Sequence, residues 1–364
     1  MRSGCKQLIE TLSEPSRACR LGPREWSELI ANARSANLLG SLAERLRANS
    51  VPYPDYAAPH LEGALQLSLR QHRSVLWEAN CLKHALAELN IPVLVLKGAA
   101  YVLAGLPAAQ GRLFGDIDIL VPRSALPDVE VRLMVNGWVS AKTDAYDQLY
   151  YRRWMHELPP MVNLKRGTVI DVHHTILPLT AASTPDASAI ITRSRPVDGL
   201  APLRIPCAED LVIHSITHLM HEGEFHNALR DLNDIDTLLR LFGANPEFWS
   251  RLPQFADEHG LRWEVEFGLS LCVSYFDTPI PEQVFQILPE RRLTKAGDRL
   301  LDLAYHQAIG PTEGARVSFK TSLARFVLYL RAHKLRMPAP LLLRHLVHKA
   351  TTRDKPGAAT PETR

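Results

Sequence analysis

The sequence predicts an α+β fold in which a small mixed sheet lies between two helical lobes. Apolar residues recur at helical spacing through the first 90 residues and again from about residue 207 to 310. Between these regions, short β-rich runs alternate with glycine and proline. We therefore expect four segments: a helical N-terminal lobe over 1–90, an α/β core over 91–180, a helical C-terminal lobe over 181–310 and a basic amphipathic segment over 311–364.

The N-terminal lobe is predicted to be entirely helical. Residues 23–48 read as one helix, with Pro23 at a first-turn position and apolar side chains such as Trp26 and Leu29 at helical spacing. A proline-rich break at 51–59 separates it from a longer helix that extends to about Asn90.

The first half of the core is predicted as two strands, each followed by a helix. IPVLVL (91–96) is a strand that ends at Lys97-Gly98, where a helix of small residues begins and extends to about Leu106. DIDILV (116–121) is the second strand, and the proline that follows opens a helix to about Asn136.

The second half of the core is predicted as two strands at 157–164 and 168–174, joined by a turn at Arg166-Gly167. A stretch rich in Ser, Thr and Pro follows over 180–206, after which the chain is helical again.

The bulk composition excludes several protein classes. With 364 residues, 46% hydrophobic and 22% charged, the chain is typical of globular proteins and unlike disordered or fibrous ones. Its five cysteines are widely spaced without a CxxC pair, which argues against a zinc knuckle or a disulfide framework. MRSGCKQLIE lacks the apolar core of a signal peptide, and the longest apolar stretch, 91–106, is shorter than the ~20 residues that span a bilayer. We expect a cytoplasmic location.

The net charge of +3 conceals a strong asymmetry. Residues 316–355 carry a local charge of +9, so the first 315 residues carry −6. Apolar side chains interleave with the basic ones at near-helical spacing. The segment either docks on an anionic membrane surface or an RNA backbone, or packs its apolar face on the protein and leaves its charges in solvent. Peripheral association with a membrane therefore stays open.

Asp116 and Asp118 carry the strongest chemical signal. Side chains alternate along a strand, so these two point to one face while Ile117 and Ile119 point to the other. Their α-carbons are expected ~6.6 Å apart, close enough for both carboxylates to bind one cation. Mg²⁺, which prefers a few carboxylates plus substrate phosphates, would relieve their repulsion. Alone, such a pair is also common on a solvent-facing strand.

Three further features favour a catalytic site. Lys97-Gly98 lies where a strand passes into a helix, a place at which backbone amides can approach a phosphate. Arg112 precedes the acidic strand, where a guanidinium could reach a triphosphate. Asp171 lies among apolar residues on a later strand, and a buried acid needs a partner such as a metal. A third carboxylate serves two-metal phosphoryl transfer as ligand or as base.

In this order, the residues resemble the nucleotidyltransferase superfamily typified by DNA polymerase beta. LKGAAYVLAGLPAAQGRLFGDIDILV is more closely similar to a family of uncharacterised bacterial nucleotidyltransferases, and more distantly to AbiEii-type toxin nucleotidyltransferases. The resemblance covers roughly residues 25–245 and includes VNGW, IDVHH and EDLVIHSITHLMHEGEFHNALRDLNDI. One departure is Ala99, which stands where the superfamily usually has Gly or Ser.

The resemblance implies transfer of a nucleoside monophosphate from ATP or another NTP to a hydroxyl. Mg²⁺, or alternatively Mn²⁺, would be held by Asp116, Asp118 and Asp171, which are the expected catalytic residues. The expected nucleotide-binding residues are Lys97, Gly98, Arg112, His173 and Asp231. The acceptor stays open among protein, RNA, a small molecule and a glycan or lipid. The alternative function is a non-catalytic nucleotide-binding or scaffold protein with the same fold.

Histidines add a second pattern. His214, His218 and His221 fall on one stripe of a predicted helix. Neither cysteine nor an HExxH arrangement accompanies them, so we expect them to line the cleft opposite the acidic strands rather than to bind zinc. His173 is two residues after Asp171 and should share its face.

Overall fold

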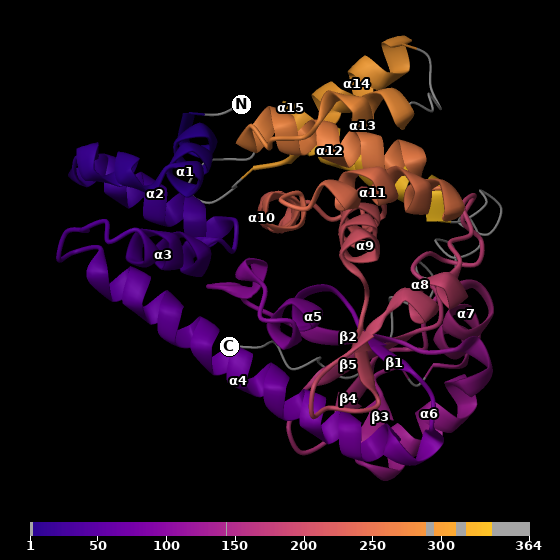
Figure 1. The fold of residues 1–364 in the computed structure, drawn as a ribbon. Coiled ribbons are helices and arrows are strands. Elements are labelled where there is room, and N and C mark those ends of the chain that lie inside the picture. Colours follow the sequence, from indigo (N-terminus) through magenta and orange to yellow (C-terminus); the bar gives the residue numbers. More distant parts are fainter. Residues whose placement is uncertain (1–2, 143, 289–294, 311–317, 337–364) are drawn as a thin grey trace.

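The structure is a computed structural model that describes residues 3–142, 144–288, 295–310 and 318–336. Figure 1 shows the N-terminal helices, a central sheet and the C-terminal helices that lie above the sheet. This arrangement confirms the predicted α+β class.

The N-terminal lobe is helical, but its predicted first helix is interrupted. Its helices are α1 (Ser3–Ser13), a 3₁₀ turn (Pro15–Arg20), α2 (Pro23–Ser35), α3 (Leu39–Ala48), the long α4 (Ala58–Leu86) and a 3₁₀ turn (Ala87–Leu89). The prediction of one helix over 23–48 is wrong at residues 36–38. Asn37 adopts a left-handed φ of +54°, a conformation that ends a helix and that Asn tolerates better than most residues. Its side-chain amide donates to Asn227 Oδ1 at 2.6 Å.

A seven-stranded mixed sheet forms the centre of the described chain, with strand order β3-β4-β5-β2-β1-β7-β6. Its strands are β1 (Val93–Val95), β2 (Asp116–Leu120), β3 (Trp138–Ser140), β4 (Met161–Asn163), β5 (Val169–His173), β6 (Arg195–Pro196) and β7 (Leu203–Ile205). β2 runs parallel to β5 and antiparallel to β1, which in turn runs parallel to β7. The four predicted strands are thus present, and Gly167 in the predicted turn has a φ of +69°.

Two strands come from the stretch that was expected to link the core to the helical lobe. β7 is only three residues long, and Arg204 separates its buried Leu203 and Ile205. It pairs with β1, and β6 pairs with β7 to form the edge of the sheet. The short β3 was also not predicted. The segment 181–310 therefore contributes strands as well as helices, and the division into four segments stays a prediction.

Helices cover both faces of the sheet. Figure 1 shows the end of α4 and α6 (Leu126–Val135) below it, and α9 (Ala208–His221) and α10 (Ala228–Phe242) above it. The other helices are α5 (Lys97–Leu103), α7 (Ala145–Trp154), α8 (Ala187–Arg193), α11 (Pro246–Glu258), α12 (Arg262–Phe276), α13 (Glu282–Ile287), α14 (Lys295–Ala308) and α15 (Phe319–Arg336). One continuous cluster of buried apolar side chains extends from Cys5 to Leu328.

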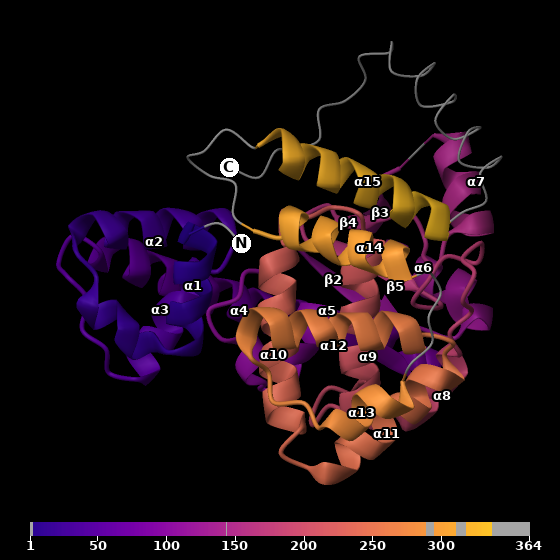
Figure 2. The same cartoon turned by 90° about the horizontal axis from the view of Figure 1, so that it is seen from above.

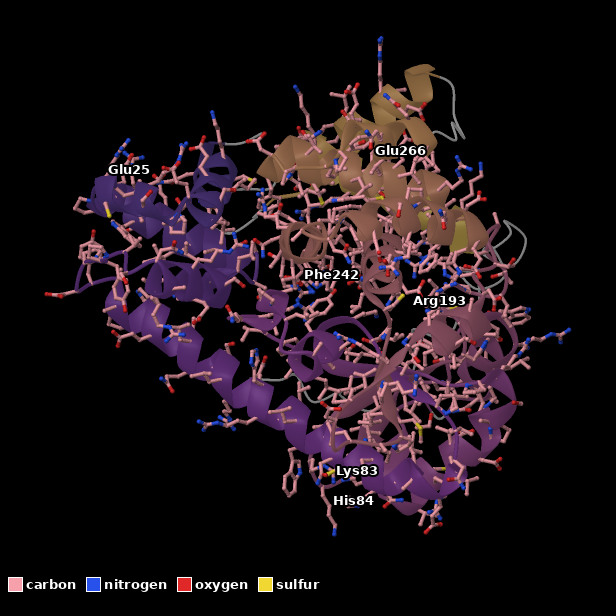
Figure 3. The ribbon with its side chains drawn as sticks, in the orientation of Figure 1. Glu25, Lys83, His84, Arg193, Phe242 and Glu266 are labelled. Carbon is pink, nitrogen blue, oxygen red and sulfur yellow. The ribbon has the colours of Figure 1, made fainter. Side chains whose placement is uncertain are left out.

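Arg193, at the end of α8, ties the edge of the sheet to the helices above it. Figure 3 shows it between α8 and those helices. Its guanidinium donates two hydrogen bonds to Asp210, both at 3.0 Å, and a third to Glu258 at 2.5 Å. It also lies 4.0 Å from the centroid of the Phe255 ring. The Asp210 side chain is fully buried, so this fork supplies the counter-charge that its burial requires.

The C-terminal helices α14 and α15 lie side by side (Figure 2). Arg325 donates to the Ala308 carbonyl, and Arg331 lies 4.9 Å from the Trp263 ring centroid. Lys320 and Lys334 are exposed. In the described part of the basic segment, some basic side chains thus contact the protein and others face solvent. The rest of the predicted segment lies outside the described residues.

No disulfide joins any two of the five cysteines, all of which are among the described residues. Among the described helices, none combines the length and the apolar character needed to cross a membrane.

Candidate functional site

The paired strands β2 and β5 present the predicted aspartates. Their parallel register sets Asp118 opposite Asp171, with Asp116 two residues before Asp118. Ile117 and Ile119, on the other face, are 5% and 0% exposed. The alternation read from the sequence therefore holds, and the apolar face anchors the strand in the core.

The aspartates open into a pocket of about 800 Å³ between the sheet and helices α9 and α10. That volume is in the range of small-molecule sites. All eight predicted site residues line it: Lys97, Gly98, Arg112, Asp116, Asp118, Asp171, His173 and Asp231. The structure thus brings together side chains that are separated by up to 134 positions in the sequence.

Asp118 is buried and held by two cationic partners. It accepts from Lys97 Nζ at 2.9 Å, and His173 Nε2 lies 2.9 Å from the same oxygen. Burial alone would raise its pKa, but Lys97 and His173 outweigh burial and hold the pKa well below its usual range. Burial likewise opposes a charged His173, yet Asp118 and Glu157 raise the pKa of His173. Asp118 is therefore ionised and fixed in position.

Lys97 reaches Asp118 through an unusual backbone conformation. It begins α5, with Leu96 alone between it and the end of β1, and its φ of +46° is in the left-handed region, which is strained for a side chain of this size. Such strain persists where surrounding contacts enforce it, and it is concentrated at functional sites. Asp118 raises the pKa of Lys97 against the effect of burial. The strand-to-helix turn thus delivers an ammonium group to the carboxylate.

Gly98 provides space for two side chains of the loop before β2. A Cβ at this position would lie 2.2 Å from Arg112 Nη1 and 2.7 Å from the Phe114 ring. No side chain larger than hydrogen fits without displacing them. The sequence explained Gly98 by phosphate approach, and the structure adds this packing requirement.

Arg112 is anchored to helix α10. Its Nε donates to Asp234 at 2.6 Å, and its Nη2 lies 3.8 Å from Asp231. The guanidinium is 5.0 Å from the Phe114 ring centroid, and its side chain is only 10% exposed. Burial lowers the pKa of Arg112, but Asp234 and Asp231 more than compensate and raise it. Sequence reasoning missed Asp234, although its position three residues after Asp231 puts both on one helix face.

Asp171 differs from Asp118 in its protonation. Burial, with repulsion from Asp118 and then Glu157, raises the pKa of Asp171 to about 7. Its Oδ1 is buried and has no hydrogen-bond partner among the described residues. Sequence reasoning also missed Glu157 as a site residue. It placed Glu157 at the start of the strand predicted over 157–164, but β4 begins only at Met161, and Glu157 pairs with His173 of β5 through an isolated bridge. Glu157 Oε2 is 3.4 Å from His173 Nδ1, and burial raises the pKa of Glu157.

The described residues offer carboxylates and imidazoles to a divalent cation. The unpartnered Asp171 Oδ1 and the exposed Asp116 fit a hard cation, which prefers oxygen ligands. Two other groups have all their ligand atoms within 4.8 Å of one another: His156, Glu157 and His173, and also His218, Glu222 and Asp231. The three predicted aspartates do not form such a group among the described residues, because their ligand oxygens do not all lie within 4.8 Å of one another.

The histidine stripe of α9 lines the wall of the pocket opposite the strands. His214, His218 and His221 all face the pocket. Burial, followed by the charge of Lys97, lowers the pKa of His214 to about 3 and that of His218 well below its usual range. These imidazoles are neutral at neutral pH. Burial next to Asp231 raises the pKa of Glu222, one residue beyond the helix, to about 7.

Comparison with known proteins gives one family. The sequence model of a family described as "Uncharacterised nucleotidyltransferase" matches residues 22–277. No curated protein is significantly similar to the chain. Among solved structures, an antigenic nucleotidyltransferase-like protein from Paracoccidioides brasiliensis is 14% identical, with a TM-score of 0.31. The match covers 58% of this chain and 96% of that one.

Proposed function

The chain belongs to the uncharacterised nucleotidyltransferase family, and from that premise we propose that it transfers a nucleoside monophosphate from an NTP to a hydroxyl acceptor. The observation that carries the proposal is the register of β2 and β5, which sets Asp118 against Asp171 at the floor of the pocket. This set of acids suits nucleotidyl transfer because it could hold a divalent cation. Such a cation would stabilise the negative charge on the oxygens around the phosphorus during the reaction.

We propose that Asp116, Asp118 and Asp171 hold the divalent cation, with Mg²⁺ preferred over Mn²⁺. The cation, when bound, would neutralise charge that develops on the phosphate oxygens during transfer. Lys97 and His173 would keep Asp118 ionised and fixed, so that its carboxylate needs little rearrangement.

The proposed reaction assigns the proton to Asp171. The acceptor oxygen attacks the α-phosphorus, its proton passes to the Asp171 carboxylate, and the bond from the α-phosphorus to the leaving pyrophosphate breaks. Without a bound cation, the pKa of Asp171 is raised to about 7, which suits a base that must accept this proton near neutral pH. Asp171 has this pKa because burial and neighbouring acids disfavour its charge.

The proposed nucleotide-binding residues are Lys97, Gly98, Arg112, His173 and Asp231, of which Arg112 and His173 would act indirectly. Arg112 is bonded to Asp234, and His173 is 4% exposed and bonded to Asp118. We therefore propose that both hold other site residues in place. Lys97, 23% exposed beside Asp118, is the better candidate for direct phosphate contact.

The acceptor is the part of the function that the residues leave open. Protein, RNA, a small molecule and a glycan or lipid all suit the same acids. Contact of the basic C-terminal segment with an anionic membrane or RNA, and with it a cytoplasmic, membrane-peripheral location, stays a prediction.

The test of transfer is labelling of an acceptor. Purified protein is incubated with each of the four NTPs labelled at the α-phosphate, Mg²⁺ and a cell lysate. We expect one labelled product and pyrophosphate release with the wild type, and neither with Asp171→Asn. Asp128→Asn, an exposed acid on α6, is the matched control and should label normally.

A non-catalytic nucleotide-binding role is the second candidate. The negative charge of Asp118 is already balanced by Lys97 and His173, and Ala99 stands where the superfamily usually has Gly or Ser. Under this alternative, the protein would bind NTP and release no pyrophosphate in any lysate fraction, and Asp171→Asn would not alter binding.

A further inference from the structure

Among the described residues that line the pocket, one basic side chain has no acidic partner. Four Lys and Arg side chains are among the described residues that line it: Lys97, Arg112, Arg230 and Arg336. Lys97 is paired with Asp118 at 2.9 Å and Arg112 with Asp234 at 2.6 Å. Arg230 donates to Asp231 at 2.7 Å. Across the described residues, no carboxylate oxygen lies within ion-pair distance of Arg336.

Arg336 is fixed at both its backbone and its side chain. Thr180 Oγ1, in the loop after β5, donates to its carbonyl at 2.5 Å, and its Nη2 donates to the backbone carbonyl of Glu222 at the end of α9. The last residue of α15 therefore bridges two segments that border the pocket. Its position does not depend on a charged neighbour.

The guanidinium retains unused donors. Its Nε is buried without a hydrogen-bond partner, while the only described acceptor of the side chain is a neutral carbonyl. Burial lowers the pKa of Arg336, and the distant charges of Glu222 and Glu157 do not restore it. Arg336 is partly buried, and a desolvated guanidinium donor without an acceptor is costly unless an anion pairs with it. Phosphate matches its planar, forked donors well.

We propose that Arg336 binds a phosphate group of a ligand in this pocket. The proposal rests on the proposed function for the identity of that ligand, since the phosphate belongs either to the nucleotide or to the acceptor. The residue lies outside the segment 22–277 that matches the family, so the contact is a property of the C-terminal helix of this chain. It gives that helix a role in ligand binding in addition to packing.

The test compares two probes on three proteins: wild type, Arg336→Gln and Lys334→Gln. Gln keeps an amide that can donate to the Glu222 carbonyl, and Lys334→Gln removes the same charge from an exposed site on the same helix. Inorganic phosphate is followed by ³¹P NMR line broadening without nucleotide, and Mg·ATP is titrated by calorimetry. Thermal melting without ligand checks that each variant is folded, and Arg336→Lys, which keeps the charge, replaces the Gln variant if that one is not.

We expect Arg336→Gln to weaken the binding of at least one probe by about tenfold or more, which is the effect of losing a charge-assisted hydrogen bond. Lys334→Gln should leave both unchanged. Weakened Mg·ATP binding assigns the phosphate to the nucleotide, and weakened phosphate binding alone assigns it to the acceptor. Wild-type affinity of Arg336→Gln for both probes overturns the inference about Arg336. The proposed function fails separately, if none of the four NTPs binds the wild type in Mg²⁺ or if the NTP that binds has equal affinity for Asp116→Asn.

Discussion

Asp118 and Asp171 are neighbours in register, yet their environments give them opposite protonation behaviour. Lys97 and His173 hold the pKa of Asp118 well below its usual range, whereas burial and adjacent acids raise the pKa of Asp171 to about 7. Separated pKa values of this kind are what acid–base chemistry at neutral pH requires. The division of roles between the two acids therefore follows from which of them has cationic neighbours.

At the residue scale, Gly98→Ala should destabilise the protein. The added methyl would overlap Arg112 Nη1 and the Phe114 ring, and overpacking of this kind typically costs about 1–3 kcal/mol. Chemical denaturation measures the free energy of unfolding. Gly63→Ala is the control, because a Cβ on that α4 residue meets nothing within 4 Å, and it should be neutral or stabilising. Equal stability of wild type and Gly98→Ala would show that the contact is not tight.

At the scale of the element, α9 makes the fold sensitive to acid. The pKa of His214 is lowered to about 3 by burial and Lys97, against an ordinary value of 6.5. Between these pH values the unfolded chain binds a proton that the folded chain does not. Stability is therefore independent of this group above pH 6.5 and falls as the pH decreases below it.

His214→Gln should reduce that loss. The difference in unfolding free energy between pH 7 and pH 5 should shrink by about 2 kcal/mol, the linkage contribution of one such histidine. Urea denaturation at both pH values measures it, and His226→Gln, a 59% exposed histidine, is the control. An unchanged pH difference in His214→Gln would mean that His214 is protonated in the folded protein.

The contact between α8 and α9 is the second prediction at this scale. Arg193→Gln would leave the buried Asp210 with His259 and Cys207 as its side-chain donors among the described residues. Breaking a buried ion pair from one side typically costs about 3–5 kcal/mol, so we expect a loss of about 3 kcal/mol in unfolding free energy. Arg195→Gln, an exposed arginine on the adjacent β6, should change it by less than about 0.5 kcal/mol. A similar loss of unfolding free energy in the two variants would contradict the role of Arg193 as the counter-charge of Asp210.

At the scale of the whole molecule, the pocket is assembled from several segments, and the local sequence predicts the structure of some of them better than that of others. The alternation of DIDILV predicted β2 and the shared face of its aspartates, and His173 shares the face of Asp171 for the same reason. Lys97-Gly98 was read correctly as a strand-to-helix turn. Hydrophobic periodicity and turn residues are sufficient to predict a segment whose own sequence contains the pattern.

The features that the sequence did not predict depend on contacts between distant segments. The partner of Arg112 is Asp234, 122 positions later. Helical spacing puts Asp234 on the same face as Asp231, but no local pattern pairs that face with Arg112. β7 exists because Leu203 and Ile205 pair against β1, although three residues carry too little pattern to predict a strand. In the sequence, Arg336 is one of several basic residues of the C-terminal segment. It differs from Lys334 in that the structure places it at the pocket.

The most direct measurement is a calorimetric titration of the protein with ATP, with and without Mg²⁺. Each of the other three NTPs is tested in the same way. The account predicts that at least one NTP binds only with Mg²⁺, that Asp116→Asn combined with Asp171→Asn weakens binding by about tenfold or more, and that Asp128→Asn binds like the wild type. Failure of every NTP to bind in Mg²⁺, or wild-type affinity in the double variant, would contradict it.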